Sequence, residues 1–203
     1  MAEKLPLTDL LAQVASCSLC GDLPLGPRPV VKIDYRARLL IIGQAPGTRV
    51  HNTGIPWNDP SGDNLRSWLG IDREQFYDDP RIAIMPMGFC YPGKGKSGDL
   101  PPRKECAPQW HQTLLEHMPD LELILLIGSY AQDYYCGKDG YRNLTERVQN
   151  WRQVLENQLS EGKAGYWPLV HPSPRNRLWM GRNPWFEAEL LPELRTAVDQ
   201  LLN

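Results

Sequence analysis

Several features that would assign a protein to a class at once are missing from this sequence. No apolar run approaches the roughly 20 residues that a membrane-spanning helix needs. Residues 1–5 contain no basic region followed by an apolar stretch, so we do not expect a secretory signal. Neither sign of charge dominates, because 22 Lys and Arg stand against 24 Asp and Glu, for a formal net charge of −2. We therefore expect a cytoplasmic protein without a membrane partner, and the overall charge does not indicate a nucleic-acid binder.

The composition that remains is that of a globular protein with many rigid loops. Hydrophobic residues make up 41% and charged residues 23% of the chain, which argues against disorder. The 19 prolines and 17 glycines cluster between the apolar segments. A length of 203 residues suffices for one domain with a full core, and we predict a single domain over residues 1–203. No feature indicates an oligomer, so a monomer is assumed.

Short apolar runs alternate with segments of helical spacing. Strands are predicted at 39–42, 82–85, 121–127 and 166–170. Helices are predicted at 7–16, 64–69, 103–117, 128–136, 144–159 and 185–202, with long loops at 48–62 and 91–102. Such alternation predicts an α/β protein, a three-layer α/β/α sandwich around a central, mainly parallel four-stranded sheet.

Two rigid loops follow predicted strands and carry polar groups. Residues 171–176 read His-Pro-Ser-Pro-Arg-Asn and come directly after the strand at 166–170. Residues 43–47 read Gly-Gln-Ala-Pro-Gly and come directly after the strand at 39–42. Because ligand sites in open α/β sheets form outside the carboxyl ends of the strands, the two loops predict one pocket with a polar rim.

Four of the five cysteines have the spacing of metal ligands. Cys17 and Cys20 form a C-x-x-C pair, Cys90 follows the second predicted strand, and Cys106 lies at the start of a predicted helix. Four thiolates suit either zinc or an iron–sulfur cluster, and the alternative is a set of scattered buried thiols. Cys136 falls within a predicted helix and is expected to be a core residue.

With these elements in this order, the chain resembles the uracil-DNA glycosylase superfamily over residues 17–194, and most closely its iron–sulfur A-type and B-type enzymes of thermophiles. The resemblance lies in the C-x-x-C pair, the motifs at 43–47 and 171–173, and the spacing of the last two cysteines. It implies a 4Fe–4S cluster, in preference to zinc, held by Cys17, Cys20, Cys90 and Cys106. It also implies hydrolysis of the N-glycosidic bond of a deaminated base in damaged DNA, uracil being the first candidate, as in base-excision repair.

The resemblance places the catalytic carboxylate outside the first motif. The A-type enzymes carry a glutamate where this chain has Gln44, and the major branch carries an aspartate where it has Ala45. The B-type enzymes carry an aspartate in a later Gly-Asp-x-Ser-Gly pattern, and residues 58–62 read Asn-Asp-Pro-Ser-Gly. Asp59 is therefore the expected catalytic residue, able to stabilise an oxocarbenium-like sugar or to orient water. The alternative is that Asp59 only caps a turn before Pro60.

The other expected site residues follow from the same resemblance. A neutral His171 would donate a hydrogen bond to the leaving base, although it could instead be a satisfied histidine at a strand end. Trp57 would stack on the flipped base, or else belong to the core. The base-binding set is Gly43, Gln44, Ala45, Trp57 and Asn58. The DNA-binding set is Ser61, Ser173, Arg175 and Asn176.

One position departs from the iron–sulfur relatives. They carry an asparagine that reads the uracil edge four places before the third cluster cysteine, and this chain has Pro86 there. Two further functions therefore stay open. One is a non-catalytic nucleic-acid or nucleotide binder on the same scaffold, with the lysines and arginines of 94–103 and 175–182 as its basic face. The other is an α/β protein that acts on a small nucleoside.

Overall fold

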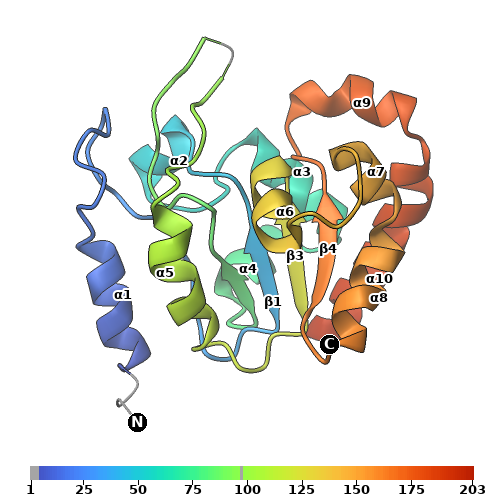
Figure 1. The fold of residues 1–203 in the computed structure, drawn as a ribbon, viewed down its shortest axis with the longest axis horizontal. Coiled ribbons are helices and arrows are strands. Elements are labelled where there is room, and N and C mark those ends of the chain that lie inside the picture. Colours follow the sequence, from blue (N-terminus) through green and yellow to red (C-terminus); the bar gives the residue numbers. More distant parts are fainter. Residues whose placement is uncertain (1–4, 97) are drawn as a thin grey trace.

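Four parallel strands form the centre of the protein in the computed structural model, which describes residues 5–96 and 98–203 (Figure 1). They are β1 (Leu39–Ile42), β2 (Ile82–Ile84), β3 (Leu123–Ile127) and β4 (Gly165–Leu169), in the order β2-β1-β3-β4. Every pair is parallel, with Leu40 opposite both Ala83 and Ile124. The predicted four-stranded parallel sheet is confirmed, and its first strand has the predicted bounds.

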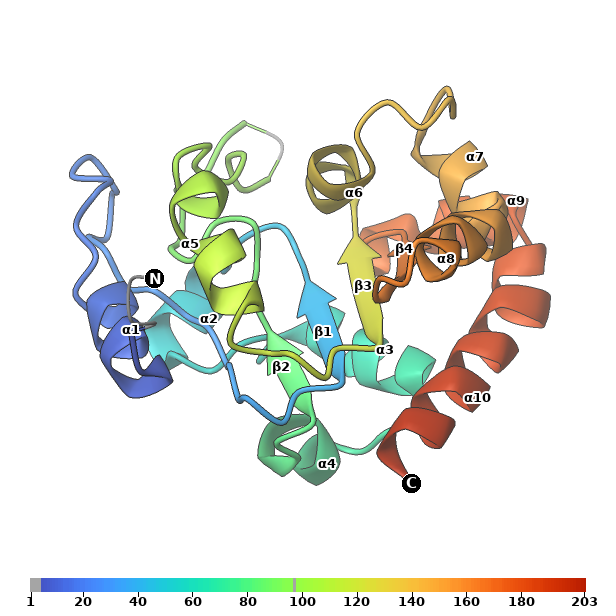
Figure 2. The same ribbon diagram turned by 60° about the horizontal axis from the view of Figure 1, so that its bottom comes forward.

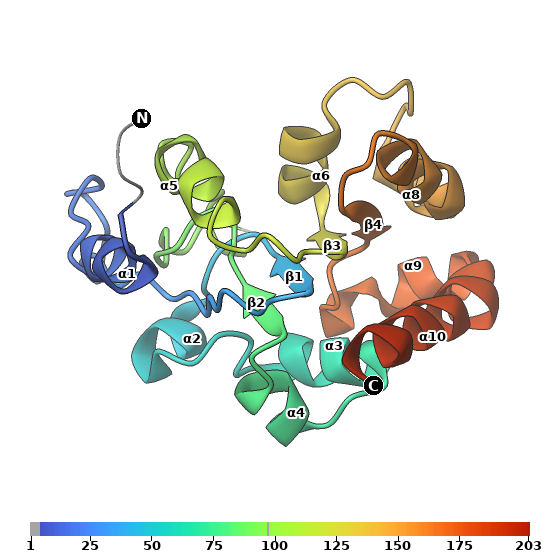
Figure 3. The same cartoon turned by 90° about the horizontal axis from the view of Figure 1, so that it is seen from below.

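Helices cover both faces of the sheet, as the continuous burial of its strands requires. One layer contains α1 (Leu7–Ala15), α5 (Cys106–Leu115) and α6 (Ser129–Cys136), which pack with Leu40 and Ile42. The opposite layer contains α3 (Pro60–Leu69), α4 (Arg73–Asp78) and α10 (Leu191–Leu202), which pack with Leu39 and Ile41. Figures 2 and 3 show the two layers on opposite sides of the strands.

The remaining helices lie around these layers. They are α2 (Thr48–Thr53), α7 (Leu144–Gln149), α8 (Trp151–Ser160), the 3₁₀ turn η1 (Pro174–Asn176), α9 (Arg177–Arg182) and the π-helical turn η2 (Phe186–Leu190). None of the helices within the described residues is long and apolar enough to cross a membrane.

The prediction of a loop over 48–62 is wrong, because α2 and the first turn of α3 lie within it. Capping interactions explain where these helices begin and end. The Asp59 side chain accepts a hydrogen bond from Gly62 N at 2.8 Å, and Pro60 occupies the first position of α3. Before it, α2 forms a short helix that ends at Gly54 in the left-handed conformation. The unpredicted α4 begins in the same way as α3, because the side chain of Asp72 accepts a hydrogen bond from Gln75 N at 2.7 Å.

Two long predicted helices are interrupted. The helix predicted at 144–159 divides at Asn150 into α7 and α8. The helix predicted at 185–202 begins as η2, and α10 follows with Pro192 in its first turn. Proline has no N–H to continue an α-helical ladder, which accounts for the changed hydrogen-bond pattern before it.

A hairpin stands between β2 and α5, on the side of the molecule to which the strands point (Figure 1). Its two sides are residues 93–95 and 98–100, and we call it the Gly93 hairpin. Gly95 N donates to Gly98 O at 2.7 Å, and Leu100 N donates to Gly93 O at 2.8 Å. Lys94 and Asp99 form an antiparallel bridge. The loop predicted at 91–102 therefore contains an ordered hairpin.

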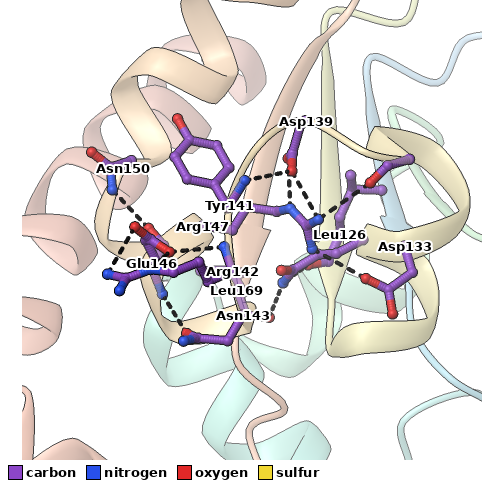
Figure 4. Close-up of polar contacts among 12 residues, drawn as sticks. Leu126, Asp133, Asp139, Tyr141, Arg142, Asn143, Glu146, Arg147, Asn150 and Leu169 are labelled. Atoms are coloured by element: carbon purple, nitrogen blue, oxygen red, sulfur yellow. Dashed lines mark hydrogen bonds and ion pairs between the residues drawn. The ribbon is translucent and has the colours of Figure 1, made fainter.

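A buried arginine fixes the loop between α6 and α7 (Figure 4). Arg147 is 5% exposed, and its guanidinium donates to Asp139 Oδ2 at 2.6 Å and to Asp133 Oδ1 at 3.3 Å. Burial would raise the pKa of Asp139, but the hydrogen bonds and positive charge of Arg147 hold it below its usual range. Beside it, Arg142 makes a similar pair with Glu146, but the Arg142 side chain is 84% exposed.

We expect Arg147→Met to lower the free energy of unfolding by about 2 kcal/mol, because Asp139 would keep its partly buried charge without a cationic partner. Urea denaturation measures this change. The matched control is Arg142→Met, which should cost less than about 0.5 kcal/mol because water screens the exposed pair. Equal losses of unfolding free energy for the two variants would contradict the expectation that the buried ion pair stabilises the protein more than the exposed one.

Candidate active site

A pocket with about 420 Å³ of empty space, part of it open solvent, lies at the carboxyl ends of the strands. Gly43 enters its wall just after β1, Pro86 just after β2, and His171 just after β4. It is lined by Val30, Gly43, Gln44, Ala45, Pro46, Gly47, Val50, Pro56, Trp57, Asp59, Ile84, Pro86 and His171. The structure thus brings the predicted catalytic pair and four of the five predicted base-binding residues to one place.

Trp57 is held in a backbone conformation that bulky residues rarely adopt. Its φ is 54°, and it is the one non-glycine with positive φ among the described residues. Its carbonyl oxygen accepts a hydrogen bond from Arg66 Nη1 at 3.4 Å. The same nitrogen donates to the Tyr77 hydroxyl at 3.3 Å, which donates in turn to Pro56 O at 2.8 Å. Arg66 and Tyr77 therefore hold the two peptide groups on either side of Trp57.

Two glycines make room for Trp57. A Cβ atom at Gly43 would lie 2.7 Å from Cζ2 of the Trp57 ring, so the indole lies directly against this part of the first motif. A Cβ atom at Gly62 would lie 1.7 Å from the Trp57 carbonyl oxygen, closer than any real contact. Both glycines are thus required by close approach rather than by their own backbone angles.

Asp59 combines a structural role with a place in the pocket wall. Its Oδ1 accepts the hydrogen bond from Gly62 N that caps α3. Asp59 is therefore a capping residue, as the alternative interpretation expected. No donor among residues 5–96 and 98–203 is paired with its other oxygen. The amino end of α3 stabilises a negative charge at this position. Among the described residues that line the pocket, Asp59 is also the one that is acidic.

His171 lies beside Trp57 in the pocket wall, with their ring centroids 5.7 Å apart and the ring planes at 37°. Burial lowers the pKa of His171 below its usual value, and the negative charge of Asp59 opposes that shift. The imidazole is accordingly neutral at neutral pH. The loop that carries it is tied down twice, because Asn64 Nδ2 donates to Pro172 O at 2.8 Å and Asn176 Nδ2 donates to His171 O at 2.7 Å.

Other predicted site residues lie outside the pocket. The Asn58 side chain turns away and accepts a hydrogen bond from Arg73 Nη2 at 3.2 Å. Ser61 lies in the first turn of α3, and Ser173 Oγ accepts from Arg175 N at 3.3 Å at the start of η1. Arg175 reaches the Gly93 hairpin, where its Nη1 lies 3.4 Å from the position of a Cβ at Gly98.

Sequence reasoning missed two residues at this site. Asp99 lies on the Gly93 hairpin, and its Oδ2 is 3.3 Å from the position of a Cβ at Gly47, a residue of the pocket wall. His111 on α5 lies behind Pro86 and pairs with its carbonyl oxygen. No motif marks either residue, because each reaches the site through a contact between segments distant in the sequence.

The four predicted metal-ligand cysteines line a second hollow, which is mostly apolar and has about 400 Å³ of empty space, part of it open solvent. Phe89 N donates to Cys106 Sγ at 3.3 Å, and the Arg28 backbone N–H donates to Cys90. The indole nitrogen of Trp110, which also lines the hollow, is buried without a partner among the described residues. Burial raises the pKa of the Cys106 thiol to about 12.

The cysteines surround this hollow without closing on one point. No three His, Cys, Asp or Glu side chains of the described chain are grouped as ligands of a metal ion. A single zinc ion would need four sulfurs at about 2.3 Å from its centre. Cys136 lies elsewhere and packs against the apolar cluster of α1 and α5, as expected for a core residue.

His111 gives the pocket wall a pH-dependent support. Its Nε2 donates to Pro86 O at 3.1 Å, its Nδ1 accepts from the Tyr135 hydroxyl at 2.6 Å, and burial lowers its pKa to about 4. Between pH 6.5 and pH 4 the unfolded chain therefore binds a proton that the folded chain excludes. The stability that His111 contributes is complete above pH 6.5 and is lost as the pH falls through this window.

We expect the free energy of unfolding to fall by up to roughly 3 kcal/mol between pH 6.5 and pH 4 because of this residue. Denaturant unfolding of His111→Gln across the same range should show a correspondingly smaller fall. The control is His117→Gln, on the same stretch of chain but hydrogen-bonded to Thr113 O and Leu5 O. If the stability of His111→Gln keeps the full pH dependence, a group other than His111 is responsible for it.

Comparison with known families agrees with this architecture. A family model described as the Uracil DNA glycosylase superfamily matches residues 31–195. The match includes all four strands, every residue of the pocket wall except Val30, and the last two cysteines of the hollow. The chain therefore belongs to the uracil-DNA glycosylase superfamily, which confirms the resemblance at that level.

Proposed function

We propose that this member of the superfamily is a DNA glycosylase that hydrolyses the N-glycosidic bond of a deaminated base, with uracil the first candidate. Membership supports a glycosylase-type hydrolase with DNA as its partner. The proposal that it hydrolyses the bond to a deaminated base is supported by one observation. Trp57, Asp59 and His171 converge on one pocket. A base inside a duplex cannot reach such a pocket, so it must first be flipped out of the stack.

In this proposal Asp59 supplies the negative charge that the reaction needs. Departure of the base leaves an oxocarbenium-like sugar, which a fixed carboxylate stabilises. One oxygen of Asp59 is committed to Gly62 N, which sets the direction of the carboxylate, and the other is available for water or the sugar. The first motif contains no acid, and no other side chain in the described part of the pocket wall is acidic.

His171 would act on the leaving base. A neutral imidazole still has one N–H to donate, and it can stabilise the negative charge that develops on the base oxygen. Its lowered pKa keeps it neutral, so this role requires no proton uptake. Trp57, beside His171, would hold the base by stacking. Asn64 and Asn176 position the histidine by fixing its loop.

Contacts with the DNA backbone would come from the same side of the molecule. Ser61 and Ser173 can bond phosphates, and Arg175 can bind phosphate or enter the duplex. In Figure 1 the Gly93 hairpin and α9 rise on either side of this region. Because the net charge is only −2, the affinity for DNA would depend on these local cations and fall steeply with salt.

We further propose that Cys17, Cys20, Cys90 and Cys106 hold a 4Fe–4S cluster. All four thiols line one apolar hollow, and four thiolates can hold such a cluster. The unpaired Trp110 N–H and the donors at Phe89 and Arg28 suit the sulfurs of such a site. When bound, the cluster would cross-link the amino-terminal segment to the sheet. Iron, sulfide and zinc analysis of anaerobically purified protein distinguishes the two metals.

A second candidate function is a non-catalytic binder of nucleic acid, and Pro86 favours it. This residue presents an apolar wall where the iron–sulfur relatives carry an amide. The deciding assay uses oligonucleotides with one uracil, hypoxanthine or xanthine, single-stranded or mispaired, followed by alkali. Strand breaks that disappear in His171→Ala support the glycosylase. Salt-dependent binding without breaks for any base supports the binder.

A further inference from the structure

The four residues 86–89, which follow β2, form part of the wall of both cavities, and we call them the β2 wall. Pro86 lines the pocket, whereas Gly88 and Phe89 line the hollow of the four cysteines. The same short segment therefore limits both cavities. Whatever holds it in place also sets the space that a base can occupy in the pocket.

The middle of the β2 wall is hydrogen-bonded to the first motif. Met87 N donates to Gly43 O at 2.8 Å, and Gly88 N donates to Gln44 O at 3.0 Å. Gly43 and Gln44 both line the pocket. A shift of the β2 wall would therefore be passed to the first motif, and two parts of the pocket lining would move together.

Pro86 has no such bond, because proline has no N–H. Its carbonyl is its one backbone polar group, and it accepts a hydrogen bond from His111 Nε2 at 3.1 Å. The His111 ring also stacks on Phe89, with the ring centroids 5.6 Å apart and the planes at 13°. His111 is 1% exposed. One buried side chain thus supports the β2 wall at both of its ends.

The second ring nitrogen fixes the orientation of His111. A carbonyl oxygen can only accept, so Nε2 carries the hydrogen of the neutral imidazole and Nδ1 is an acceptor. Nδ1 accepts from the Tyr135 hydroxyl at 2.6 Å. Both nitrogens are therefore paired, as buried polar groups in folded proteins usually are. Because His111 belongs to α5 and Tyr135 to α6, the β2 wall is held from one layer of helices.

We propose that His111 is a positioning residue for base recognition, which holds the β2 wall and the first motif in the arrangement that a bound base requires. This inference rests on the proposed function. His111 is not among the described residues that line the pocket, so it acts through Pro86 and Phe89. Its loss should weaken binding of the base but not of the DNA backbone, since the predicted phosphate-binding residues lie on α3 and in the His171 loop.

The test compares His111→Leu with His111→Gln. Both substitutions remove the ring, but glutamine keeps an N–H that can donate to Pro86 O. NMR titration with free uracil or free hypoxanthine measures the affinity of the pocket, and fluorescence anisotropy with an undamaged duplex measures binding of the DNA backbone. We expect His111→Leu to raise the Kd for the base about 5- to 10-fold, as for one lost buried hydrogen bond, and to change the Kd for the duplex less than about twofold. His111→Gln should recover most of the affinity for the base.

Tyr135→Phe tests the orientation of His111 without removing its ring. This variant should also raise the Kd for the base, and it replaces His111→Leu if that protein does not fold. The matched control is Tyr134→Phe. The Tyr134 ring is also near His111, with centroids 6.0 Å apart, but Tyr134 is 47% exposed, and its loss of a hydroxyl should leave the Kd unchanged.

Unchanged affinity for the base in a folded His111→Leu protein would overturn the inference. Equal losses in His111→Leu and His111→Gln would overturn it as well, because the bond to Pro86 would then have no part in binding. If neither base binds to the unaltered protein, the inference fails, and the excision assay decides on the proposed function alone. If the base binds and depends on His111 but no base is excised, the proposed function fails and the positioning role stands.

Discussion

Replacing Asp59 with asparagine is expected to lower the single-turnover rate constant for base excision by about 100-fold or more, with no loss of thermal stability. Removal of one preorganised electrostatic group from an active site typically costs that much. Asparagine is as good a helix cap as aspartate, so the Gly62 N–H keeps its acceptor and α3 keeps its start. Only the charge that faces the pocket disappears. Rates are measured on a uracil-containing oligonucleotide, and stability is measured by thermal melting.

Asp59→Ala separates the two roles of the residue. It should lose the same activity and, in addition, about 1 kcal/mol of stability, because the cap is removed as well. Asp72→Ala provides the matched control, since it removes the equivalent cap from α4 and leaves the pocket intact. Full excision activity in a stable Asp59→Asn protein would leave Asp59 as a helix cap alone and move the catalytic charge to another group.

Gly62→Ala is expected to destabilise the protein by about 3 kcal/mol and to reduce excision at least as much as Asp59→Asn. The added methyl group would meet the Trp57 carbonyl oxygen at 1.7 Å. Backbone must move to relieve that contact, and overpacking of this kind typically costs 1–3 kcal/mol, occasionally more. The displaced peptide carries Trp57, and the helix start that must shift carries Asp59. Denaturant unfolding and the oligonucleotide assay measure the two effects.

Gly181→Ala is the control for helix propensity. Gly181 also lies in a helix, α9, but an added Cβ meets nothing within 4 Å. This substitution should leave stability unchanged or raise it by up to about 1 kcal/mol. A Gly62→Ala protein as stable and active as Gly181→Ala would show that the Trp57 segment adapts without cost.

The strands and the main site residues were predictable because their signals are local. The apolar run at 39–42 lies between a charged segment and a Gly/Pro loop, and the parallel topology then places the loops at 43–47 and 171–176 at one edge. Asp59 was found through its motif. The helix that it caps was predicted at 64–69 but begins earlier, at Pro60, because the polar composition of 48–62 concealed both α2 and the first turn of α3.

The rest of the site depends on contacts between distant segments. The positive φ of Trp57 follows from packing against Gly43 and Gly62, which no local preference of tryptophan predicts. Asn58 was expected at the base because it precedes Asp59, yet Arg73 of α4, an unpredicted helix, holds its side chain. Asp99 reaches Gly47 only because the Gly93 hairpin folds back across more than 40 positions of sequence.

The backbone conformation of Trp57 bears on how a base would be received. A left-handed φ in a bulky residue costs roughly 1–3 kcal/mol, and here Arg66 and Tyr77 hold it in place within the folded chain. The indole therefore has few alternative positions before any ligand enters. A nucleotide that leaves the stack and enters the pocket loses conformational entropy. The Trp57 side of the pocket is already ordered, so it loses little entropy when the base binds. The ordering of this side of the pocket takes place when the chain folds, ahead of any encounter with DNA.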